Sequence, residues 1–146
     1  MNNLMIISLV GLAGGLAIGL QAPLAAIIGQ RTGMLESVFI IHIGGAIGAL
    51  LILLTMKGGN LGQWQTVPWY ALLGGLLGII LISSQVYIIP NIGVAAAITL
   101  IIAGQLITAT FIDHFGMLGI EANTINWRRL LGLSIVLAGV WMTIKN

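Results

Sequence analysis

The chain has 146 residues, of which 59% are hydrophobic and only 5% are charged. Soluble globular domains carry about 25% charged residues, so this composition excludes a water-solvated surface and predicts an integral membrane protein in contact with lipid. The net charge of +2 comes from five basic and three acidic side chains and gives no reason to expect nucleic-acid binding. The absence of cysteine excludes disulfides, thiolate metal sites and a cysteine nucleophile.

Segments of about 20 apolar residues are long enough to cross a bilayer, and the chain contains five of them. In chain order, the predicted helices are residues 4–29, 34–56, 67–89, 92–112 and 127–144. The first lacks a basic leader and is too long for a signal-peptide core, so we expect a retained membrane helix. Pro90-Asn91 is expected to break the chain between the third and fourth helices. The prediction is an all-α membrane protein whose single domain covers residues 1–146.

Positive charges are almost evenly divided between the two sides of the membrane. Five spans place the N-terminus with Lys57, Arg128 and Arg129 on one side, and Arg31 and Lys145 on the other. Orientation follows the Lys/Arg bias of short loops, and three against two is a very small bias. We therefore expect dual topology and an antiparallel dimer forming a ten-helix bundle. The alternative is a fixed orientation decided by Arg128 and Arg129.

Glycines recur at helical spacing, and part of the pattern repeats along the chain. Small residues four apart allow membrane helices to approach closely, as expected for the stripes Gly11/Gly15/Gly19, Gly44/Gly48 and Gly74/Gly78. Several positions of the first two helices also recur 60 residues later, with Gly33 matching Gly93. This offset suggests that the first two helices and the next two form similar hairpins.

Glu36 lies in an apolar run, about 5 Å inside the second predicted helix. A carboxylate at this place has two interpretations. It can be stabilised by the helix dipole and by nearby Arg31, or it can bind protons or cations at the mouth of a cavity.

His42 lies about 14 Å into the same helix, near the middle of the bilayer. Its direction differs from that of Glu36 by roughly 120°, so the two do not share one stripe of the helix. A neutral histidine bonded to a neighbouring helix is one interpretation, and a coupling or substrate-binding group is the other. A metal site would need further ligands, so none is predicted.

Further polar residues are candidates for the lining of a transport cavity. Pro23 should kink the first helix and free a backbone carbonyl, as in many transport sites. Glutamine amides bond their own helix less readily than hydroxyl groups do, so they are the stronger signals. The cavity-lining candidates are Gln21, Pro23, Ser84, Gln85, Tyr87, Asn91 and Gln105.

No motif of soluble enzymes is present. The glycines of GLAGGLAIG lie inside an apolar helix and are not followed by the Lys-Ser/Thr of a phosphate-binding loop. The sequence therefore predicts neither an enzyme nor a cofactor, and ATP-driven transport by this chain alone is disfavoured.

The segments LQAP and AGQL…DHFG carry the most specific part of a likeness that covers nearly the whole chain. Through them the chain resembles the YdcZ-like family of five-helix proteins in the drug/metabolite transporter superfamily. The resemblance implies an antiparallel homodimer, or a heterodimer with a paired homologue, in the bacterial inner membrane. It names no substrate and no functional residues.

These observations predict a secondary transporter that moves a small metabolite or drug-like molecule, with proton coupling through Glu36 as a hypothesis. Two alternatives remain open at this point. One is a dual-topology ion channel, although no ring of charges or filter-like loop is apparent. The other is a non-transporting subunit that stabilises a partner.

Overall fold

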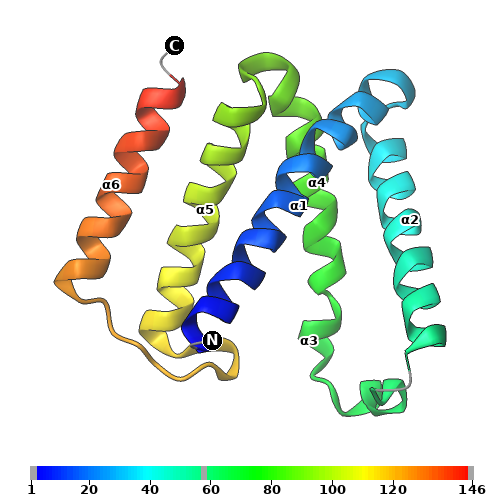
Figure 1. The fold of residues 1–146 in the computed structure, drawn as a ribbon, viewed down its shortest axis with the longest axis horizontal. Coiled ribbons are helices and arrows are strands. Elements are labelled where there is room, and N and C mark those ends of the chain that lie inside the picture. Colours follow the sequence, from blue (N-terminus) through cyan, green and yellow to red (C-terminus); the bar gives the residue numbers. More distant parts are fainter. Residues whose placement is uncertain (1–2, 57–58, 145–146) are drawn as a thin grey trace. The chain divides into compact units, whose positions relative to one another are not determined.

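The computed structural model of the chain describes residues 3–56 and 59–144, so Lys57 and Lys145 of the charge count lie outside the described residues. Its elements are almost entirely helical (Figure 1). In order they are α1 (Asn3–Thr32), α2 (Met34–Thr55), the 3₁₀ helix η1 (Leu61–Thr66), α3 (Trp69–Leu72), α4 (Gly74–Ile92), α5 (Val94–Phe115), the 3₁₀ turn η2 (Met117–Gly119) and α6 (Trp127–Ile144).

The prediction of five membrane spans is confirmed by the length and composition of the helices. The described residues contain five helical segments apolar enough to cross a bilayer, the third being Trp69–Ile92, which joins α3 and α4. The last span was predicted at 127–144 and begins and ends at those residues. The second ends at Thr55, one residue before the prediction. The first continues to Thr32, three residues beyond the predicted end, and runs through Pro23.

The predicted chain break at Pro90-Asn91 is wrong. Pro90 lies inside α4, which continues to Ile92. Proline removes one backbone donor, but membrane helices tolerate this where neighbouring groups satisfy the freed carbonyl. The helix ends instead at Gly93, whose φ of 82° lies in a region that only glycine adopts at low cost.

The predicted end of the fourth span at residue 112 is also wrong. Helix α5 continues through Asp113 and His114 to Phe115, so these polar residues belong to the last turn and not to a loop. The end is set by Gly116, which adopts the left-handed conformation with φ 62° and donates its N–H to Ile112 O. This is the usual role of a glycine just beyond a helix C-terminus.

A single glycine separates α1 from α2, and another separates α4 from α5. Gly33 has φ 115° and ψ 159°, and Gly93 has φ 82° and ψ 166°. Each carbonyl accepts the N–H four residues later, at 3.1 Å, from Ser37 and from Ala97. The two turns lie 60 residues apart, at the offset of the sequence repeat, and their similar backbone supports that repeat.

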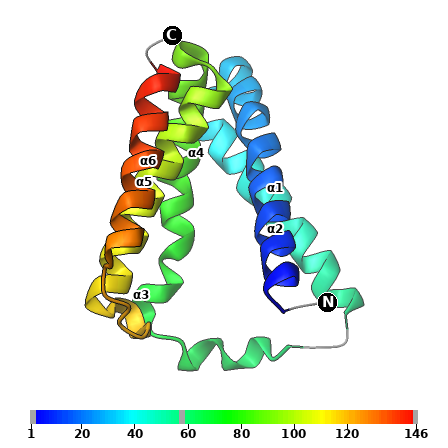
Figure 2. The ribbon, with the colours of Figure 1, turned by 60° about the vertical axis from the view of Figure 1, so that its left-hand side comes forward.

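The chain divides into two units, residues 1–90 and residues 91–146. In the first, α1 and α2 lie side by side as a hairpin (Figure 2). Its small core joins three helices through Ala25 of α1, Val38 of α2, and Ile82 and Val86 of α4. In the second unit, α5 packs against α6. Most large apolar side chains remain exposed, as expected for helices in contact with lipid or with other membrane helices.

Candidate functional site

Glu36 lies in the first turn of α2 and is exposed. Its carboxylate folds back over Gly33, the residue that precedes the helix, in space that a side chain at Gly33 would occupy. No ion pair joins it to Arg31 in the described part of the chain. The structure therefore places Glu36 at the positive end of the helix dipole, on an accessible surface, where a carboxylate is favoured.

His42 is half-buried in α2 and contacts a second helix. Its Nδ1 lies 2.8 Å from Val38 O. Because a carbonyl oxygen only accepts hydrogen bonds, Nδ1 is the nitrogen that carries the proton. Its other nitrogen, Nε2, faces Gly78 of α4, where a methyl group would lie only 2.7 Å away. The ring thus bonds its own helix through Nδ1 and turns Nε2 toward Gly78 of α4.

We expect Gly78→Ala to lower the free energy of unfolding by about 1–2 kcal/mol relative to Gly75→Ala. The methyl group at residue 78 must displace the His42 ring, which then loses its bond to Val38 O. Gly75 lies in the same helix, and a methyl group there meets no described atom within 4 Å. The measurement is thermal or denaturant unfolding in a fixed detergent. Equal stabilities of the two variants would contradict the contact.

Among the described residues of the first unit, two polar side chains are almost fully buried, and they differ in their partners. Ser37 of α2 is 0% exposed, and its hydroxyl donates to Ala25 O of α1 at 2.8 Å. Gln85 of α4 is 1% exposed, and no described group donates a hydrogen bond to its Oε1. A buried polar atom without a partner costs about 1–3 kcal/mol, so Gln85 requires an explanation that Ser37 does not.

Ser37 is a residue that sequence reasoning missed. A serine inside a membrane helix is a weak signal because its hydroxyl can bond its own helix backbone. The neighbouring residue Glu36 was a candidate in the same helical turn, but the sequence did not predict the bond from Ser37 to α1. Ser84, in contrast, was predicted to line a cavity, but its hydroxyl donates to Ile80 O of its own helix at 2.8 Å.

The other cavity candidates are not as deeply buried as Gln85. Pro23 and Ser84 are half-buried, and four residues are exposed, namely Gln21, Tyr87, Asn91 and Gln105. Their role as cavity lining therefore stays a prediction.

The second unit contains the most extensive polar network among the described residues. At the end of α5, Asp113 forms an ion pair of 2.5 Å with Arg129 of α6, and both are about one-third exposed. Arg129 also donates to Asn123 O at 3.2 Å, and Asn123 donates its N–H to Asp113 O at 2.7 Å. These bonds join the two helices through their connecting loop, which is a structural role.

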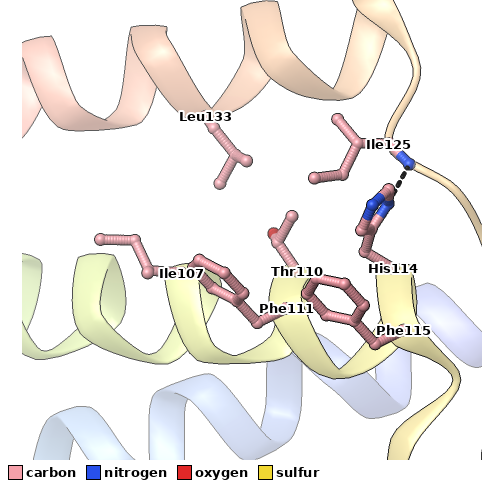
Figure 3. A pocket seen from close by; sticks show the side chains of 7 residues that line it. All are labelled: Ile107, Thr110, Phe111, His114, Phe115, Ile125 and Leu133. Atoms are coloured by element: carbon pink, nitrogen blue, oxygen red, sulfur yellow. Dashed lines mark hydrogen bonds between the residues drawn. The ribbon is translucent and has the colours of Figure 1, made fainter.

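An apolar pocket of about 410 Å³ lies beside this network (Figure 3). Its lining includes the stacked rings of Phe111 and Phe115, with Leu133 of α6 on the opposite side. His114 lies at one end, and its Nδ1 accepts the Ile125 N–H at 3.2 Å. The pocket has little polar surface, so its chemistry suits an apolar group. Across the described ranges, no three His, Cys, Asp or Glu side chains gather as a metal site would require.

The sequence profile of the family described as "Putative inner membrane exporter, YdcZ" matches residues 6–142. The chain belongs to the YdcZ family. It is 23% identical over 138 residues to the inner membrane protein YdcZ of Escherichia coli (strain K12), a match that covers 92% of each chain. No solved structure matches. The resemblance that the sequence suggested is thus confirmed, and so is a multi-pass location in the inner membrane, which agrees with the five spans.

Proposed function

We propose that this YdcZ-family protein is a secondary transporter that exports or exchanges a small metabolite or drug-like molecule. The observation that carries this proposal is the match to the family described as "Putative inner membrane exporter, YdcZ", which covers the chain from the first span to the last. The sequence contains no phosphate-binding loop, which favours a gradient over ATP as the energy source. Transport of this kind is not an enzymatic activity.

The working form that we propose is an antiparallel dimer. Five helices give each chain an odd number of crossings, so two oppositely oriented copies supply the inverted symmetry that many transporters build into one chain. Methyl groups placed on Gly11, Gly15, Gly19, Gly44 or Gly48 would meet no described atom within 4 Å. These stripes are therefore available to helices of a second chain, where close backbone contact stabilises the assembly. A paired homologue in place of a second copy is the alternative.

Glu36, together with His42, is the proposed route of proton coupling. Glu36 is exposed at the start of α2, where it can exchange protons with an aqueous cavity. His42 lies about 9 Å further along the helix and turns Nε2 toward Gly78 of α4. A carboxylate and an imidazole at two depths of one helix support a proton-driven mechanism.

Topology is the first test of the dimer. The chain has no cysteine, so Gln63→Cys in the exposed η1 segment is a clean reporter for a membrane-impermeant thiol reagent. We expect about half of the protein to be labelled in intact cells and all of it after permeabilisation, because the positive charges scarcely favour one orientation. Glu121→Cys, in the loop on the same side of the membrane, should give the same fraction. All-or-none labelling would contradict the homodimer and would direct the search to an oppositely oriented homologue.

Flux through the purified protein tests the transport function itself. In proteoliposomes with an imposed pH gradient, a carrier should give slow and saturable uptake of its substrate. Large passive ion currents would instead identify a channel. A chain that neither forms a stable dimer nor binds a ligand when purified alone would be a subunit of another assembly.

A further inference from the structure

We propose that Gln85 binds the transported molecule, and that its Oε1 accepts a hydrogen bond from an N–H or O–H group of that molecule. This inference rests on the proposed transport function and names the class of substrate: a small molecule that carries a hydrogen-bond donor.

Gln85 lies in the packed interior of the first unit. It lies on the same face of α4 as Ile82 and Val86, which form the small core with Ala25 of α1 and Val38 of α2. Gly29 of α1 lies against the side chain of Val86, which directly follows Gln85 in the sequence. The amide is therefore on the helix face where α4 meets α1 and α2, and not on a face turned to lipid.

The same region of the fold contains a second buried polar side chain, Ser37, whose hydroxyl has a hydrogen-bond partner because it donates to Ala25 O. Gln85 is buried to the same degree, yet nothing in the described residues donates to its Oε1. Because buried polar side chains are nearly always bonded, an orphan oxygen calls for a partner that the fold itself does not supply.

An amide oxygen only accepts hydrogen bonds, so the complementary group must be a donor, such as an ammonium, amine or hydroxyl. A carboxylate or phosphate offers only acceptors and would be repelled by the oxygen. The other buried residues of α4, Ile82, Val86 and Ile89, are apolar, which favours a molecule with an apolar body beside its donor.

Oε1 is covered in this conformation, so a ligand reaches it only when α4 separates locally from α1 and α2. Glycines allow these helices to approach, through Gly29 against Val86 and Gly78 against His42. Opening at these contacts would expose the amide, and the bond to the ligand would offset the cost of opening.

The test compares Gln85→Met with the wild-type chain purified in lipid nanodiscs, followed by tryptophan fluorescence during heating. Methionine has nearly the same shape without the polar oxygen. We expect its unfolding midpoint to be higher by about 2–4 °C, because the substitution removes an unsatisfied group. Ser37→Ala, which removes a satisfied buried hydroxyl, should lower the midpoint. A Gln85→Met protein destabilised like Ser37→Ala would overturn the inference, since the amide would then be a structural group.

Ligand class is tested with matched probes on the same samples. Benzylammonium carries N–H donors, and benzyltrimethylammonium has the same ring and charge without them. We expect benzylammonium to raise the midpoint of the wild type, with the quaternary probe having less effect, and this difference to vanish in Gln85→Met. Gln85→Glu, which keeps an acceptor oxygen, should restore it. No effect of benzylammonium on the wild type, or an equal effect on Gln85→Met, would overturn the assignment.

These readouts need no gradient and no flux, so they separate the two proposals. Absence of the probe difference in a wild-type protein that shows normal flux would refute the role of Gln85 alone. A clear probe difference in a protein without flux would refute the transport function while leaving Gln85 as a ligand-binding residue.

Discussion

Glu36→Gln is expected to lower the flux driven by a pH gradient by about tenfold or more, because an essential proton carrier is lost. Glutamine has nearly the same shape as glutamate but cannot take up and release a proton. The residue is exposed at the first turn of α2, so the substitution removes no buried contact. Uptake into proteoliposomes with and without an imposed pH gradient is the measurement.

Two further variants separate coupling from a structural role of Glu36. Glu36→Asp keeps a titratable group and should retain part of the proton-driven flux. Glu121→Gln changes an acid in the exposed loop and should leave the flux unchanged. If Glu36 only stabilises the helix dipole, Glu36→Gln costs about 0.3–1 kcal/mol of stability and leaves proton-driven flux intact. That result would remove Glu36 from the mechanism.

Gly29→Ala is expected to lower the free energy of unfolding by about 1–3 kcal/mol. A methyl group at residue 29 would overlap both methyl groups of Val86 and approach its Cβ to 3.2 Å. Valine is branched at Cβ and cannot rotate away easily, so α4 itself must move from α1. Because Gln85 adjoins Val86, the same substitution should also change the response to benzylammonium.

The matched control for Gly29→Ala is Gly14→Ala in the same helix. Gly14 is exposed, and a methyl group there meets no described atom within 4 Å. Alanine is the better helix former by up to about 1 kcal/mol, so this variant should be as stable as the wild type or slightly more stable. Denaturant unfolding in one detergent compares the pair. If both variants unfold alike, α1 and α4 do not meet at Gly29.

The membrane class, the number of spans and most helix boundaries follow from hydropathy along the chain. This succeeds because a spanning helix satisfies its own backbone and needs only sufficient apolar length, which is a local property. The prediction from hydropathy and prolines was wrong at Pro90. This proline was expected to end the helix, but the helix continues to Ile92 and ends before Gly93. The prediction was wrong again after residue 112, because polar side chains do not end a helix before its glycine cap at Gly116.

The candidate site shows a different limit. Sequence reasoning selected Glu36, His42 and several glutamines because each is costly in hydrocarbon, but it could not rank them. Gln85 and Gln105 were equally strong candidates for cavity lining in the sequence, yet Gln85 is 1% exposed and Gln105 is exposed. Ser37 gave almost no signal, and it forms a bond between two helices.

By itself, the sequence determined that this protein is an integral membrane protein, that it crosses the bilayer with five helices and that it resembles the YdcZ family. Each of these properties depends on the order and composition of neighbouring residues. Only the tertiary structure decided that His42 faces Gly78 and that the Gln85 oxygen is buried without a partner. The physical reason is that burial and hydrogen bonding of a side chain depend on atoms from distant segments, which local periodicity does not specify.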